Sequence, residues 1–169
     1  METFDTIFKR RSIRKFTGEK IPPDILEKIL RAAMAAPSAG NGQPWHFIVI
    51  DDPAILEKIA AANPYAAMAK PAGLAIMVCG DVDSGKFSGY WMVDCSAAVQ
   101  NLLLAVTDLG LGAVWTGIYP REERLKQYRE ILTLPENIMP LALIPVGYPA
   151  EDPGREDRFK PERIHRNKW

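Results

Sequence analysis

Residues 73–79 read Gly-Leu-Ala-Ile-Met-Val-Cys, an almost continuous apolar run that ends at Gly80 and Asp81. A short apolar run between turn-forming residues predicts a β-strand that is covered on both faces. A sheet buried on both faces needs a layer of other elements above it and another below it. The run therefore predicts a layered protein, and the segments on either side of it supply the layers.

Strands are also predicted at residues 45–50, 113–118 and 138–146. The first of these is aromatic and β-branched and follows a polar loop. The last contains Pro140 and Pro145, and proline cannot donate a hydrogen bond to a neighbouring strand. We therefore expect residues 138–146 to lie at an edge of the sheet or in an irregular part of it.

Helices are predicted around these strands, because apolar residues recur there at helical spacing. The segments are residues 3–8, 23–36, 53–62, 90–109 and 121–132. Residues 90–109 are apolar almost all the way round, so we expect this helix to be central and buried. The alternation of helices and strands predicts a layered α/β/α architecture.

The composition excludes several classes of protein. With 169 residues, 21 basic and 21 acidic side chains, the chain lacks the basic excess of a general nucleic-acid or anionic-membrane binder. No apolar run approaches the roughly 20 residues that span a bilayer, and no signal peptide is visible. The two cysteines and two histidines lack metal-ligand spacing. We expect a cytoplasmic protein with no metal, no membrane and no nucleic-acid partner.

The last 20 residues differ in character from the rest. Eleven of residues 150–169 are charged, and the only apolar anchors are Phe159, Ile164 and Trp169. A frayed, solvated tail is one interpretation. We favour a C-terminal arm that docks onto a partner subunit, which divides the chain into a domain at 1–149 and an arm at 150–169.

A basic run at residues 9–16 is the first candidate binding segment. Five of these eight residues are cationic, in a chain whose formal net charge is zero. If the run is extended, Arg10, Ser12 and Arg14 point to one side, and Arg11 and Lys15 point to the other. Two guanidiniums and a hydroxyl on one side suit a phosphate. The alternative is a solvated basic patch at a helix end.

Two glycine-containing loops are further candidates. Residues 37–45 read Pro-Ser-Ala-Gly-Asn-Gly-Gln-Pro-Trp, and their small residues allow a flat or phosphorylated ligand to approach the backbone, although an ordinary connection has the same composition. Residues 110–117 begin like a dinucleotide fingerprint, but Trp115 replaces its third glycine and the order of helix and strand is reversed. Trp115-Thr116-Gly117 could instead end a strand beside a ligand, with core packing of Trp115 as the alternative.

Taken together, these segments resemble the FMN-dependent nitroreductase family. The resemblance runs from Phe8 to Trp169 and rests on four motifs in order, which are residues 10–16, residues 37–45, residues 101–118 with their Asn-Leu-Leu-Leu-Ala and Trp-Thr-Gly-Ile sequences, and Gly-Tyr-Pro at 147–149 before an arginine-bearing tail. It implies a nitroreductase-like three-layer α+β sandwich with a mostly antiparallel or mixed sheet. It also implies an intertwined homodimer that exchanges its C-terminal arm and holds FMN at the subunit interface.

The resemblance assigns roles to particular residues. Arg10, Ser12 and Arg14 would hold the phosphate and ribityl chain, with Arg11 adjacent. Arg158, or Arg155 as the fallback, would complete the phosphate clamp. The remaining cofactor-binding residues would border the isoalloxazine ring: Pro37, Ser38 and Ala39 from the other subunit, Asn41 and Gln43 at the loop or the polar edge of the ring, and Trp115, Thr116 and Gly117 near the flavin N5. Asn63 or Lys70 is the available candidate for a further amide or cation of the family.

The predicted activity follows from the cofactor, because the sequence contains no nucleophile paired with a base and no metal site. We expect an FMN-dependent oxidoreductase that takes hydride from NADH or NADPH and reduces nitroaromatics, quinones or related small planar acceptors in a ping-pong cycle. The chemistry would reside in the flavin N5, with no catalytic side chain. The alternatives are a flavin reductase, a flavin-fragmenting enzyme, a non-catalytic flavin or nucleotide sensor, and an α/β dimer without a ligand.

Overall fold

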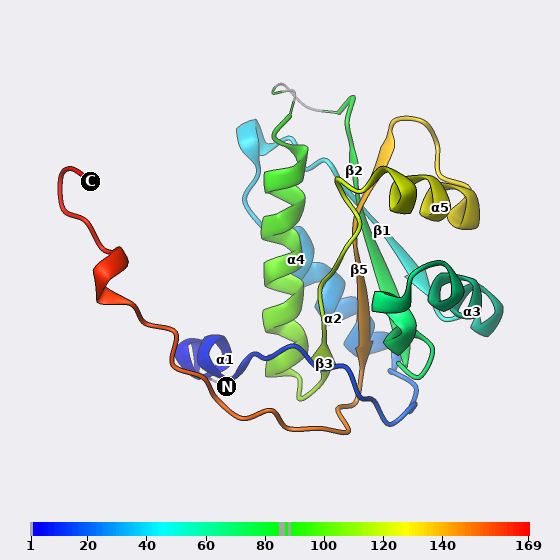
Figure 1. The fold of residues 1–169 in the computed structure, drawn as a ribbon, viewed down its shortest axis with the longest axis horizontal. Coiled ribbons are helices and arrows are strands. Elements are labelled where there is room, and N and C mark those ends of the chain that lie inside the picture. Colours follow the sequence, from blue (N-terminus) through cyan, green and yellow to red (C-terminus); the bar gives the residue numbers. More distant parts are fainter. Residues whose placement is uncertain (1, 85–86, 88) are drawn as a thin grey trace.

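The computed structural model describes residues 2–84, 87 and 89–169 (Figure 1). Its helices are α1 (Thr3–Lys9), α2 (Pro23–Met34), α3 (Pro53–Ala62), α4 (Trp91–Asp108) and α5 (Glu122–Leu132), with 3₁₀ turns η1 (Ala39–Asn41), η2 (Pro64–Ala69) and η3 (Pro161–Arg163). Its strands are β1 (Trp45–Ile50), β2 (Leu74–Asp81), β3 (Gly112–Ala113), β4 (Thr116–Gly117) and β5 (Ile138–Gly147). These bounds confirm the predicted helices and most of the predicted strands.

The sheet is antiparallel throughout, in the order β1-β2-β5-β3, and β4 also pairs with β5. Along β2, Leu74, Ile76 and Val78 enter one hydrophobic cluster, and alternate residues enter the other. Helices α2 and α4 cover the first face, and α3, η2 and α5 cover the second (Figure 1). The strand predicted from residues 73–79 is therefore buried on both faces, in a three-layer sandwich.

Strand β5 is central, so the expectation of an edge position was wrong. The predicted irregularity is present. The register of β5 against β2 shifts between Val78 and Cys79, and Cys79 is the residue that pairs with Pro140. A bulge at this point accommodates the missing N–H of the proline. Helices on both faces then bury the strand regardless of its prolines.

The single strand predicted at residues 113–118 is split into β3 and β4. Val114 donates its N–H to the carbonyl of Pro145 at 3.4 Å. In an antiparallel ladder the return bond would need an N–H on residue 145, which proline lacks. Pairing therefore lapses at Val114 and Trp115 and resumes at Thr116.

Helix α4 is central, as expected, but it is not buried all round. Cys95, Val99, Leu102 and Val106 are fully buried on its sheet side. Val93, at 58% exposure, lies on a side that the described residues leave open. No helix in the described ranges is long and apolar enough to cross a membrane.

Residues 150–169 extend away from the body of the molecule (Figure 1). Apart from Glu151, every residue of this arm is exposed, and Trp169 is fully so. The arm therefore has almost no core of its own in one chain. Its apolar residues Phe159 and Ile164 are 71% and 58% exposed, so within one chain they stay in contact with solvent.

Candidate functional site

The basic run after α1 lies against the sheet edge as an extended segment. Ile13 donates its N–H to the carbonyl of Ala113 at 2.9 Å, and Ser12 forms a parallel bridge with Ala113. An added Cβ on Gly112 would lie 2.7 Å from Ile13, so glycine is needed for this close packing. The predicted extended conformation is confirmed, with Ile13 buried and its polar neighbours facing outward.

A cavity of about 460 Å³ opens beside this segment. It is lined by Arg11, Ser12, Arg14, Lys15, Glu151, Pro153 and Arg158. The predicted division of side chains between two sides stays a prediction, because residues from both predicted sides border this cavity. Isolated bridges hold the segment in place of a regular ladder.

The root of the arm is fastened to the basic segment. The Glu151 carboxylate accepts the N–H groups of Arg14 at 2.6 Å and Lys15 at 3.1 Å. The hydrogen bond from the Arg14 N–H is the largest cause that lowers the pKa of Glu151 below its ordinary value. Arg11 donates to the carbonyls of Pro153 and Gly154 at 3.2 and 2.6 Å. These contacts bring the two ends of the chain together.

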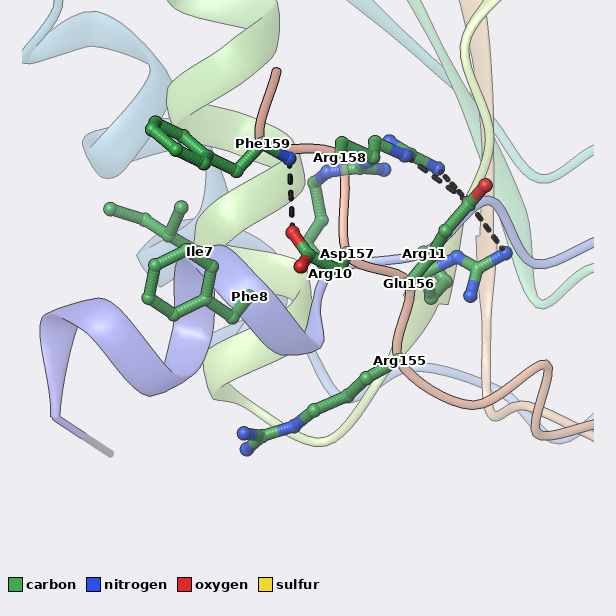
Figure 2. Close-up of a pocket in the computed structure, with 9 residues that line it drawn as sticks. All are labelled: Ile7, Phe8, Arg10, Arg11, Arg155, Glu156, Asp157, Arg158 and Phe159. Carbon is green, nitrogen blue, oxygen red and sulfur yellow. Dashed lines mark hydrogen bonds and ion pairs between the residues drawn. The ribbon is translucent and has the colours of Figure 1, made fainter. Parts of the chain in front are cut away.

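A second cavity of about 580 Å³ lies where α1 meets the arm (Figure 2). Its lining residues are Ile7, Phe8, Arg10, Arg11, Arg155, Glu156, Asp157, Arg158 and Phe159. Arg11 and Arg158 line both cavities, so the two are continuous in their cationic wall. The cavity confirms that guanidinium groups from both ends of the chain converge.

The charges in this second cavity are unequally paired. Glu156 lies between Arg158 and Arg11 and pairs with them at 2.8 and 3.5 Å (Figure 2). The Arg10 side chain has no hydrogen bond or ion pair among the residues that the structure describes. Burial, and then the neighbouring charges of Arg158 and Arg11, lower the pKa of Arg10. An uncompensated cation in such a place favours an anion.

Arg155 and Arg158 have different surroundings. Arg155 pairs with Asp5 at 3.6 Å and points away from the other guanidiniums (Figure 2). Arg158 lines both cavities. The geometry within one chain therefore favours Arg158 as the residue of the arm that faces an anion.

A third cavity, of about 360 Å³, adjoins the first through Arg14, which lines both. Its other lining residues are Pro64, Tyr65, Met68, Val114, Trp115, Thr116, Gly117 and Arg124. Three predicted residues, Trp115, Thr116 and Gly117, are thus brought together with Arg14. Trp115 is 37% exposed, so the alternative of core packing does not describe it.

The backbone of Gly117 faces this third cavity. Arg124 donates to the Gly117 carbonyl at 2.7 Å, so that carbonyl points away from β5. In an antiparallel ladder the N–H and C=O of one residue point to the same side. The Gly117 N–H therefore also faces outward. The Thr116 side chain points toward β5 instead, since its buried hydroxyl donates to the Leu143 carbonyl at 2.6 Å.

The sequence analysis missed several of the other lining residues of this cavity. Tyr65 and Met68 come from η2, and Arg124 comes from α5, which the sequence presented only as an exposed charged helix. No local motif marks them, because their relevance depends on the packing of η2 and α5 beside β4. The candidates Asn63 and Lys70 lie elsewhere. Asn63 is buried with its amide on the Tyr128 hydroxyl, and Lys70 pairs with Glu57.

The loop at residues 37–45 is held internally. Gln43 donates its N–H to the Ser38 hydroxyl at 3.0 Å and its side-chain amide to Asn41 at 2.8 Å. Asp94, which we assigned only to the first turns of α4, accepts the Ala39 N–H at 3.0 Å. Asn41 and Gln43 thus stabilise the loop, which is one of their two predicted roles. Pro37 starts it, two residues after Ala35, the C-cap of α2.

The loop and the basic segment lie at opposite ends of α4. The loop is fastened to Asp94, whereas α1 is fastened through Thr6 to Asp108 at 3.2 Å. Fourteen residues of helix between these anchors span about 21 Å. The predicted site is therefore present in two parts, and a single chain does not join them.

The described residues contain no cluster of three or more side chains that could hold a metal ion. Cys79 and Cys95 are free and buried, and burial raises the pKa of each thiol to about 12. Neither thiol is therefore a nucleophile near neutral pH.

The fold and the cavities first define a class, an α+β protein with arginine-lined cavities along the open edge of an antiparallel sheet. The particular family follows from comparison. The model of the nitroreductase family matches residues 7–81 and 61–148. The chain belongs to the nitroreductase family.

Relatives and solved structures agree with this assignment. A protein of Methanothermobacter thermautotrophicus, provisionally named an NADH dehydrogenase/NAD(P)H nitroreductase, is 50% identical over all of this chain and 88% of its own length. An FMN-dependent nitroreductase from Clostridium difficile R20291 is 29% identical, with a TM-score of 0.91 over 98% of this chain and 99% of the other. A provisionally assigned nitroreductase from Desulfovibrio desulfuricans, solved in complex with FMN, is 32% identical, with a TM-score of 0.85 over 100% and 98%. The predicted nitroreductase-like fold is confirmed.

Proposed function

We propose that this protein is an FMN-dependent NAD(P)H oxidoreductase that works as a homodimer. The observation that carries the proposal is the continuous cationic wall formed by Arg10, Arg11, Arg14 and Arg158, in which neither Arg10 nor Arg14 forms an ion pair among the described residues. Such a wall suits a phosphate monoester, because guanidinium groups donate to its oxygens in planar pairs. The named nitroreductases of similar structure support FMN as the phosphate-bearing ligand.

The residues present fit FMN at both of its ends. The phosphate and ribityl chain would lie along Arg10, Ser12 and Arg14, with Arg158 closing over them from the arm. The isoalloxazine ring would lie in the third cavity, where Trp115 borders it and the outward N–H of Gly117 supplies a hydrogen-bond donor. Arg14 lines both cavities, so it would bind where the chain joins the ring.

A second copy of the chain would complete this site. The loop with Pro37, Ser38 and Ala39 lines none of the three cavities and lies about 21 Å along α4 from α1, so a partner's loop would border the ring. The surface that a partner would cover is apolar, with Phe4, Phe8 and Phe159 at 74%, 62% and 71% exposure. Burying such side chains is worth about 1.5–3 kcal/mol each, which favours association.

Bound FMN would accept hydride from NADH or NADPH and pass electrons to a planar acceptor such as a nitroaromatic or a quinone. The side chains would hold and orient the cofactor. The cations of the wall would compensate its negative charge, and the Gly117 N–H would donate to its ring. The buried thiols take no part, because their pKa values of about 12 keep them protonated.

The test is direct. We expect purified protein to be yellow, to release FMN on denaturation, and to sediment as a dimer. NADH or NADPH should bleach the flavin under anaerobic conditions, and a nitroaromatic or a quinone should restore its colour. A protein that takes up no FMN in titration contradicts the proposal. Flavin that binds but stays oxidised with both nicotinamides indicates the sensor alternative.

A further inference from the structure

The third cavity contains a cation that the proposed cofactor does not require. Arg124 lies on α5, and its guanidinium is fixed by two contacts. One is the hydrogen bond to the Gly117 carbonyl at 2.7 Å, and the other is the face of Tyr65, whose ring centroid lies 5.4 Å from the guanidinium carbon. Two such contacts hold this long side chain across the cavity and reduce the entropy that it would lose on binding a ligand.

The charge of this cavity is positive. Arg14 and Arg124 line it, and no carboxylate does. Among the described residues, no acidic side chain forms an ion pair with Arg124. A guanidinium has five N–H donors in a planar fork, and the Gly117 carbonyl uses one NH₂ group, so donors remain for a ligand. A carboxylate matches that fork in shape and charge.

The other walls of the cavity are flat and apolar. Tyr65 is 70% exposed and Trp115 is 37% exposed, and both line the cavity that contains Arg124. An aromatic ligand can therefore lie against the rings while its substituent reaches the guanidinium. Arg14 is assigned to the cofactor, which leaves Arg124 as the cation for the substrate.

We propose that Arg124 makes this enzyme selective for planar aromatic acceptors that carry a carboxylate. This inference rests on the proposed function, and it assigns Arg124 a role in substrate binding. The carboxylate binds the free donors of Arg124, and the aromatic ring lies over the cofactor in the cavity that Tyr65 and Trp115 line. Arg124 also donates to the Gly117 carbonyl, so one side chain both binds the substrate and holds the Gly117 backbone.

The experiment compares 4-nitrobenzoate with 4-nitrobenzamide, which has the same ring and nitro group but no charge. The FMN-loaded protein should have a higher kcat/KM for the benzoate. The R124Q variant should lower that preference by about tenfold, which corresponds to the smaller end of the range for a hydrogen bond to a charged group. The loss should appear in KM for the benzoate. R124K should retain part of the preference, and K126Q, on the same helix but outside the cavity, should retain all of it.

A second readout does not depend on turnover. Benzoate, which is not reduced, should perturb the absorbance of the oxidised flavin at lower concentration than benzamide, and R124Q should remove that difference. Equal affinity of the unaltered protein for the two ligands overturns the proposal, whatever the variants do. An equal loss for both nitro compounds in R124Q also overturns it, because Arg124 would then only support Gly117.

The two levels of the argument fail separately. A preparation that takes up no FMN contradicts the proposed function. A preparation that carries FMN, is reduced by NADH or NADPH and shows no benzoate preference contradicts only the role of Arg124. If R124Q changes only the preference for NADPH over NADH, the guanidinium binds a phosphate of the donor, and the proposal is wrong.

Discussion

The two ends of α4 differ in how their polar groups are satisfied. At the end near Asp94, the loop at residues 37–45 closes its hydrogen bonds within itself and onto α4. At the end near Asp108, the basic segment and the arm present four arginines to a cavity in which Arg10 remains unpaired among the described residues. The first end is stable without a ligand, whereas the second gains from an anion.

Removal of the arm is the largest test of this comparison. Deleting residues 150–169 removes Arg158 and the exposed apolar anchors together. We expect FMN affinity to fall by at least about tenfold, since the lost hydrogen bond from Arg158 to a charged group contributes about 1.5–3 kcal/mol. The dimer should also dissociate more readily in sedimentation velocity. A truncated protein that stays dimeric and flavin-loaded would contradict both roles of the arm.

Substitution of single arginines in the cavity should weaken FMN binding without lowering the stability of the FMN-free protein. Arg14→Ala should weaken FMN binding by about 1.5–3 kcal/mol in a flavin titration. Arg10→Ala should do likewise, without lowering the melting temperature of the FMN-free protein, because it removes repulsion from Arg158 and Arg11. Lys126→Ala, far from the wall on α5, is the control. A large loss of FMN-free stability in Arg10→Ala would show that this guanidinium is structural.

The loop end should respond in the opposite way. Asp94→Ala leaves the Ala39 N–H without its partner, so we expect a loss of about 1–3 kcal/mol in the free energy of unfolding by denaturant titration. Asp94→Asn keeps an acceptor oxygen and should lose less. If Asp94→Ala leaves the stability of the FMN-free protein unchanged, the loop is not held by this contact and the contrast between the two ends fails.

The smallest effect concerns acid. The pKa of Glu151 is lowered in the folded protein, chiefly by the Arg14 N–H, from an ordinary value of 4.5. Its contribution to stability is therefore fully present above about pH 4.5 and is lost as the pH falls through the lower folded pKa. We expect limited proteolysis of the arm to accelerate in that range. Glu151→Gln should flatten the pH dependence, and an unchanged profile would assign the acid response to other carboxylates.

Most of the fold was predictable because its signals are local. The apolar run at 73–79 and the proline-started helix at 53–62 depend only on nearby residues and on their periodicity, and both are confirmed. For β5 the predicted irregularity is confirmed and the predicted edge position is wrong, because a bulge and a broken neighbour accommodate Pro140 and Pro145 in a central strand. That accommodation comes from β2 and from the gap between β3 and β4.

The candidate site divides in the same way. Arg10, Ser12, Arg14 and Gly117 were predicted from motifs, and the structure brings them to adjoining cavities. Arg124 was not, because its helix resembles any charged surface helix until it packs beside β4. The predicted roles in binding FMN, and the contribution of a partner's loop, stay predictions.

By itself, the sequence determined the elements, the cationic segment and the family, since these depend on composition and spacing along the chain. Only the tertiary structure decided which cations share a cavity, which face of Gly117 is open, and that the loop and the basic segment lie at opposite ends of α4. The physical reason is that side chains distant in sequence meet only through packing. Their charges then act on one another across a few ångströms, at distances that no local pattern encodes.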